Sequence, residues 1–360
     1  MIGKSVYDID TPALVIDLDA MERNIRRMAD FFRDRPARLR PHAKTHKTPE
    51  LAKMQLDAGA IGITCAKLGE AEVMADAGIR GLLLANEVIG AQKIARLVEV
   101  AKKSDIIVAV DQAENAREIS DAASAAGVRV RVLIEVDVGQ GRCGVRPGGA
   151  AVRLAQEVLR FRGLLFKGVM GYEGHVVLNP DREVRESECQ KSMTQLVGTK
   201  EALEAAGIPV EVVSGGGTGT YSVTGAFPGV TEVQAGSYIT MDARYKGLGL
   251  GFECALTVLT TVVSRNGPEV VVCDAGMKAV TREFGMPESK DPRMEVLHLS
   301  EEHGKLTVKD PGGVSYRVGD KIELIPSHGC TTINLHDTFY GARAGRVEAV
   351  WDIAARGKVR

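Results

Sequence analysis

A lysine in a basic turn is a group that could form a covalent bond to a ligand. Lys44 lies within residues 40–49, between a short apolar strand and a helical pattern over 50–58. Pro49 at the first helical position, with Thr48 as N-cap, predicts strand, turn and helix in that order. In a parallel β/α architecture, Lys44 at a strand's carboxyl end can point into an active-site cleft. A solvated basic loop is the alternative interpretation.

A glycine-rich loop supplies candidate donors for a phosphate. Residues 214–220 read Ser-Gly-Gly-Gly-Thr-Gly-Thr directly after a predicted strand, and residues 235–238 form a second donor-rich turn after the next strand. Successive glycines let backbone amides approach an anion, and the last two loops of a β/α barrel commonly hold a phosphate. A lysine facing such a ligand suggests a Schiff base to pyridoxal phosphate, whereas a phosphosugar barrel with a lysine ligand is the competing interpretation.

His328 and Cys330 form a candidate metal pair. On an extended segment, which is what we expect here, the two side chains lie on one face. Imidazole and thiolate can bind a divalent metal, although a buried cysteine is usually a small hydrophobe.

The elements that must position these residues follow a β/α alternation. Eight strand-like runs and the helical patterns between them predict a (β/α)₈ barrel. An open doubly wound sheet would give the same local pattern, but no early Gly-x-Gly-x-x-Gly marks a dinucleotide turn. The strand-like runs precede Lys44 and lie at 61–65, 81–85, 105–110, 128–138, 165–171, 210–213 and 231–234.

After residue 249 the pattern changes to short strands with polar turns, which predicts a second, all-β domain. We therefore expect a barrel over residues 12–248 and a β-rich domain of 1–11 and 249–360 that carries the metal segment. We also expect the two domains to meet over the active site.

The composition excludes several classes of partner. The chain has 360 residues, a net charge of −1 and 44% hydrophobic residues, so no general basic field favours nucleic acid or an anionic membrane. No signal peptide or membrane-spanning run is visible. The six cysteines are scattered singly, which favours a reducing cytoplasm over a disulfide framework. A small-molecule substrate fits these features best.

Five motifs together resemble the D-threonine aldolase and D-serine dehydratase family, which are alanine-racemase-like, fold-type III pyridoxal phosphate enzymes. The motifs occur in one order over nearly the whole chain. They are residues 40–44, 135–145, 214–220, 232–238 with Met241 and Asp242, and 351–357.

The resemblance implies a role for each candidate residue. Lys44 would carry the cofactor, Arg142 would lie near its phenolic oxygen, and Tyr172 would approach its ring nitrogen. His175 is a catalytic candidate, and a homodimer is expected. The residues implied around the phosphate are Gly216, Gly217, Thr218, Ser237 and Tyr238.

The family also places a divalent metal (Mn, Mg, Co or Zn) at His328 and Cys330. Aldolases of the family resemble His-x-Asp at this position and dehydratases His-x-Cys, so Cys330 departs from the aldolase pattern. A thiolate favours zinc. The early His175 is also more dehydratase-like, whereas residues 351–357 are aldolase-like.

We therefore expect a metal-dependent lyase of the D-threonine aldolase type, which cleaves β-hydroxy-D-amino acids to glycine and an aldehyde. The alternative is a D-serine or 3-hydroxyaspartate dehydratase, which releases a keto acid and ammonia. An amino-acid racemase is more distant, because racemisation needs no Lewis acid at the β position. A small non-enzymatic pyridoxal-phosphate-binding protein would lack the β domain.

Overall fold

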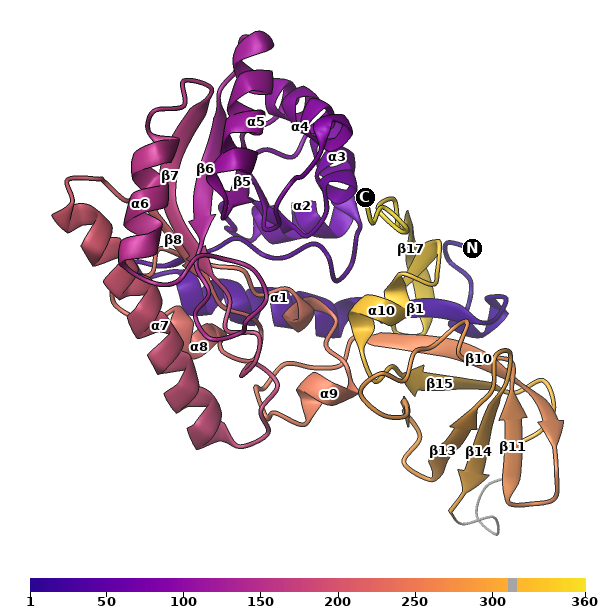
Figure 1. The fold of residues 1–360 in the computed structure, drawn as a ribbon. Coiled ribbons are helices and arrows are strands. Elements are labelled where there is room, and N and C mark those ends of the chain that lie inside the picture. The colour runs from indigo at the N-terminus through magenta and orange to yellow at the C-terminus, as the bar shows by residue number, and fades with distance from the viewer. Residues whose placement is uncertain (310–315) are drawn as a thin grey trace. The chain divides into compact units, whose positions relative to one another are not determined.

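The strands form two sheets, each within its own compact unit of the chain (Figure 1). The structure is a computed structural model that describes residues 1–309 and 316–360. We call the two units the barrel unit and the β unit. The barrel unit comprises Met28–Lys44, Pro49–Gly236 and Gly357–Arg360, and the β unit comprises Met1–Arg27, Thr45–Thr48 and Ser237–Arg356.

The barrel unit is built on an eight-stranded parallel sheet with the order β2-β9-β8-β7-β6-β5-β4-β3. Its strands are almost continuously apolar; all five residues of β5, for example, are buried, as expected for a parallel sheet covered on both faces. The strands are β2 (Arg38–Leu39), β3 (Ile63–Cys65), β4 (Leu82–Leu84), β5 (Ile106–Val110), β6 (Val130–Glu135), β7 (Leu164–Gly171), β8 (Val212–Gly215) and β9 (Glu232–Val233).

Backbone hydrogen bonds join the two ends of this strand order. The Ile61 amide donates to the Leu39 carbonyl (2.9 Å), and the Thr64 amide donates to the Pro41 carbonyl (2.8 Å). The Ala43 amide donates in turn to the Thr64 carbonyl (2.8 Å). The predicted eight strands and the barrel-type fold are therefore confirmed.

Helices alternate with the strands along the barrel unit (Figure 1). Each buries one apolar face: α4, for example, buries Ile94, Leu97, Val98 and Val100, while Lys102 and Lys103 lie in its last turn, where cations complement the helix dipole. The helices are α2 (Pro49–Asp57), α3 (Leu68–Asp76), α4 (Ala91–Lys103), α5 (Ala113–Ala125), α6 (Gly149–Val158), α7 (Arg182–Ala205) and α8 (Tyr221–Thr224). Helix α1 (Leu18–Phe32) contributes residues to both units.

The β unit contains a nine-stranded sheet whose main path is β13-β14-β11-β10-β1-β16-β17. Strands β1 and β16 are parallel, and the other pairs are antiparallel. The strands are β1 (Ala13–Asp17), β10 (Leu256–Arg265), β11 (Val270–Cys273), β12 (Glu288–Ser289), β13 (Met294–Leu299), β14 (Gly304–Val308), β15 (Lys321–Ile325), β16 (Thr338–Arg343) and β17 (Arg346–Asp352). Its short helices are η1 (Val6–Asp8), η2 (Ser237–Ile239), α9 (Ala243–Lys246) and α10 (Gly329–Ile333).

The contacts divide the chain differently from the boundaries expected at residues 12 and 249. Strand β1 lies between β10 and β16 in the nine-stranded sheet, so it belongs to the β unit. Residues Thr45–Thr48 also cluster there, where the Ala355 amide donates to the Lys47 carbonyl (3.0 Å). Within the described residues, no helix is long and apolar enough to cross a membrane.

Candidate functional site

Lys44 lies at the carboxyl end of β2, on the side of the sheet where β/α barrels place their active-site loops. Backbone contacts fix the segment before it: the His42 amide donates to the Ala235 carbonyl (3.3 Å) after β9. The Lys44 amide donates to His42 Nδ1 (3.4 Å). The Lys44 side chain is half-buried, so its amine is placed by the end of the sheet rather than by a free loop.

Tyr172 brings two of the predicted residues together. It follows β7 directly, and its ring centroid is 5.7 Å from Lys44 Nζ and 5.5 Å from Arg142 Cζ. A cation within about 6 Å of an aromatic ring is attracted by the ring's quadrupole. Lys44, Arg142 and Tyr172, which come from three different loops, therefore form one cluster.

Arg142 contacts a buried carboxyl group, Glu135, to which the sequence analysis assigned no role. Its guanidinium lies 3.2 Å from Glu135 at the end of β6. Burial and the charge of Glu87 raise the pKa of Glu135 to about 8, and Arg142 opposes that rise. Burial and Glu87 also raise the pKa of the Cys143 thiol to about 11. A carboxyl group held protonated near neutral pH beside the predicted cofactor residue is typical of functional sites.

The glycine loop packs too closely to carry side chains. A Cβ on Gly216 would lie 2.9 Å from Val233 Cγ1, and one on Gly217 would lie 3.3 Å from the Tyr172 ring. Gly216 also has a φ of 80°, a conformation that favours glycine. Gly217 therefore places its backbone directly against the ring that contacts Lys44 and Arg142, and buried Thr218 follows it.

A fully buried carboxylate, Glu173, ties this loop together. It accepts hydrogen bonds from the Gly216 amide (3.1 Å) and from the hydroxyls of Thr220 (2.6 Å) and Thr224 (2.9 Å). The amide of Gly217 donates to the Thr220 hydroxyl (3.2 Å). Glu173 is the residue after Tyr172, and that adjacency to a predicted site residue was the available sequence signal.

The remaining predicted residues lie on both units. His175 is exposed, and a Cβ on Gly139 would lie 3.0 Å from its Nε2, which places the ring beside the loop that carries Arg142. Ser237 and Tyr238 are buried in η2 of the β unit, directly after Gly236.

His328 and Cys330 lie close to each other, but the prediction that their segment is extended is wrong. Cys330 lies in the first turn of α10, and His328 is its N-cap residue. The helix begins here because Asp242 Oδ2 accepts the Gly329 amide (3.0 Å). Burial lowers the pKa of His328, but hydrogen bonds with Asp242 and Cys330 outweigh it and raise that pKa to about 10.

The pair offers one nitrogen and one sulfur donor to a metal. Among residues 1–309 and 316–360, no group of three or more His, Cys, Asp and Glu side chains is arranged for a metal ion. Two protein donors are fewer than the three of a typical catalytic zinc site, so water or substrate would fill the remaining positions of a bound ion. The Cys330 thiol also donates to the Thr45 hydroxyl (3.4 Å), and Thr45 is the residue after Lys44.

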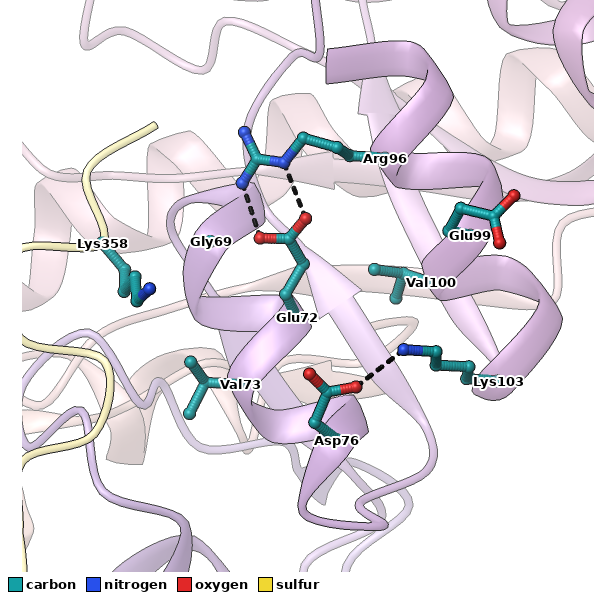
Figure 2. Close-up of a pocket in the computed structure, with 9 residues that line it drawn as sticks. All are labelled: Gly69, Glu72, Val73, Asp76, Arg96, Glu99, Val100, Lys103 and Lys358. Carbon is teal, nitrogen blue, oxygen red and sulfur yellow. Dashed lines mark hydrogen bonds and ion pairs between the residues drawn. The ribbon is translucent and has the colours of Figure 1, made fainter. Parts of the chain in front are cut away.

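A pocket of about 210 Å³ lies on the outside of the barrel unit, between α3, α4 and the C-terminal segment (Figure 2). Ion pairs join Arg96 to Glu72 and Lys103 to Asp76 across it. None of the predicted site residues lines this pocket. Its lining residues are Gly69, Glu72, Val73, Asp76, Arg96, Glu99, Val100, Lys103 and Lys358.

Comparisons with known proteins match both parts of the chain. Residues 16–244 match the family "Alanine racemase, N-terminal domain", and residues 255–342 match "Putative serine dehydratase domain". D-threonine aldolase from Arthrobacter sp is 40% identical, over 99% of this chain and 95% of that protein. 3-hydroxy-D-aspartate aldolase from Paracoccus denitrificans is 38% identical, over 99% of this chain and 94% of that protein.

Solved structures agree over the whole fold. The crystal structure of D-threonine aldolase from Filomicrobium marinum has a TM-score of 0.97 and 40% identity, and the match covers 100% of this chain and 99% of that one. D-threo-3-hydroxyaspartate dehydratase from Delftia sp. HT23 has a TM-score of 0.87 and 29% identity, over 97% of this chain and 98% of that one.

Proposed function

The chain belongs to the D-threonine aldolase and D-serine dehydratase family of fold-type III pyridoxal phosphate lyases, and we propose that it cleaves β-hydroxy-D-amino acids to glycine and an aldehyde. The cluster of Lys44 and Arg142 about the Tyr172 ring is the observation that carries this proposal. Identity of 40% and 38% to two aldolases, each over 99% of this chain, favours the aldolase reaction.

The barrel unit has residues that fit pyridoxal phosphate. Lys44 would hold its aldehyde carbon, Arg142 would donate to its phenolic oxygen, and Tyr172 would lie toward its ring nitrogen. When bound, the cofactor supplies an electron sink for the negative charge left at Cα. The phosphate cradle of this proposal is formed by Gly216, Gly217, Thr218, Ser237 and Tyr238, and its support is their position after β8 and β9, because the last two loops of a β/α barrel commonly hold a phosphate.

His328 and Cys330 would bind the divalent metal, for which Zn, Mn, Mg and Co are the candidates. The ion would lower the pKa of the substrate's β-hydroxyl. We assign His175 as the base that takes the hydroxyl proton, supported by its exposed ring beside the Arg142 loop.

The dehydratase reaction is the second candidate, and Cys330 is the observation that favours it. In that reaction Lys44 would take the α proton and the β-hydroxyl would leave as water. Hydrolysis of the resulting unsaturated amine by another water would then give a keto acid and ammonia. Family resemblance supports a homodimer, and the singly scattered cysteines support a cytoplasmic location.

Product analysis separates the two reactions. The purified, cofactor-loaded protein is incubated with D-threonine or D-serine in the presence of manganese or zinc, and the products are identified. We expect glycine and acetaldehyde from D-threonine. A keto acid and ammonia as the main products would replace the aldolase assignment by the dehydratase. A Lys44→Ala variant serves as the control and should give neither set of products.

The metal pair is tested by His328→Ala and Cys330→Asp. His328→Ala should keep the cofactor's visible absorption and lose cleavage, because attachment of the cofactor needs only Lys44 and the phosphate loops. Cys330→Asp replaces a thiolate by a carboxylate, so metal preference should move from zinc toward manganese. Full activity of both variants in the presence of a chelator would remove the metal from the proposal.

A further inference from the structure

We infer that Asp242 is the positioning residue of the metal pair: it fixes the ring of His328 and the start of the helix that carries Cys330. This inference rests on the metal site proposed above and assigns a residue that touches neither the metal nor the substrate. One carboxylate would therefore set the geometry of both donors.

The contact with His328 decides which ring nitrogen is available. Asp242 Oδ2 lies 2.9 Å from His328 Nδ1, and the two side chains are 1% and 16% exposed. Oδ2 can accept a hydrogen bond from Nδ1, so a metal would bind at Nε2 after that nitrogen releases its proton. A carboxylate that holds the non-ligating nitrogen in this way fixes the ring orientation and raises the basicity of the other nitrogen.

The same oxygen also fixes Cys330 through the backbone. Oδ2 accepts the Gly329 amide (3.0 Å), which is one of the amides at the start of α10 that have no partner within the helix. Cys330 is the next residue. Movement of the Asp242 carboxylate would therefore displace the imidazole and the thiol together.

Asp242 is itself held rigidly. Its other oxygen, Oδ1, accepts the Tyr245 amide (2.8 Å) and caps α9. The preceding Met241 is buried with a φ of 51°, in the left-handed region that residues other than glycine rarely adopt. Such a conformation persists when surrounding contacts hold it, so the carboxylate has little freedom to follow a displaced histidine.

Asp242→Asn tests this role while keeping the helix cap, because asparagine caps helices about as well as aspartate. It no longer presents a charged acceptor to His328 Nδ1. We expect Zn²⁺ and Mn²⁺ to bind the cofactor-loaded variant about 10- to 100-fold more weakly by isothermal titration calorimetry. The cofactor's visible absorption should not change. The matched control is Asp274→Asn, which removes a carboxylate that accepts from Thr260 and Thr261 in the same unit.

A second variant and a spectrum separate positioning from a general structural effect. Asp242→Glu keeps the charge and should recover part of the affinity, and Co²⁺ bound to Asp242→Asn should show altered visible bands. If Asp242→Asn binds Zn²⁺ and Mn²⁺ as tightly as the wild type and its Co²⁺ spectrum is unchanged, the inference about Asp242 is wrong, whereas the proposed metal site is unaffected. If His328→Ala binds the metal as tightly as the wild type does, the proposed metal site itself is wrong.

Discussion

Neutralising Glu232 should destabilise the barrel unit more than any exposed charge change, because its partner is a buried arginine. Arg40 Nη2 lies 2.8 Å from Glu232 Oε2, and Arg40 Nε lies 3.1 Å from both carboxylate oxygens. The two side chains are only 8% and 2% exposed. Glu232→Gln keeps the shape but leaves a buried guanidinium without its counter-charge, which costs about 3–5 kcal/mol.

Urea unfolding followed by circular dichroism measures this loss. Replacing both partners by apolar residues, Arg40→Met with Glu232→Leu, should cost less than Glu232→Gln, because no uncompensated charge remains. Glu211→Gln is the matched control. It removes the exposed partner of Lys167 and should change the unfolding free energy by less than about 1 kcal/mol. If Glu232→Gln also costs less than about 1 kcal/mol, the proposed role of the buried pair is incorrect.

Two further predictions concern the Arg142 cluster and the glycine loop. Because the pKa of Glu135 is raised to about 8, the folded protein binds one proton more than the unfolded protein at pH values between the unfolded pKa and 8. As the pH rises through that window, the free energy of unfolding of the wild type should therefore fall, relative to that of Glu135→Gln, by up to about 1.4 kcal/mol per pH unit. Urea midpoints of the two proteins that change in parallel with pH would contradict this. A Cβ on Gly219 would lie 1.8 Å from the Val177 carbonyl oxygen, so Gly219→Ala should weaken pyridoxal phosphate binding in an absorbance titration. Gly198→Ala in α7 meets no atom within 4 Å and should bind the cofactor as the wild type does.

The barrel could be predicted from sequence because each of its strands is a short apolar run beside a helix of a different period. The pattern is local, so all eight strands were found. Strand β1 has the same local pattern, but its partners are β10 and β16, more than 200 residues later in the chain. Its place in the β unit follows from non-local pairing, which periodicity does not report. The same holds for residues 45–48, which are held by contacts such as that between Lys47 and Ala355.

Lys44 was predicted from its type and its position at a strand end, whereas Arg142 and Tyr172 came from the family resemblance, and the structure brings the three together. The prediction of an extended conformation for His328 and Cys330 was wrong for a specific reason. The Gly329 amide donates a hydrogen bond to Asp242, 87 residues earlier, and a helix starts there. A short segment of mixed polar residues gives no local indication of such a partner.

Four buried acids to which the sequence analysis assigned no role share one feature, because each contacts a predicted element. Glu135 contacts Arg142, Glu173 accepts from the glycine loop, and Asp242 accepts from His328. Glu232 likewise pairs with Arg40 just before Lys44. Burying a carboxylate is unfavourable unless hydrogen bonds or a counter-charge compensate it, so each acid holds its partner in one geometry. Neutral replacements at Glu173, Glu232 and Asp242 should therefore alter cofactor or metal binding, because each of these acids holds a segment that carries or precedes a predicted site residue.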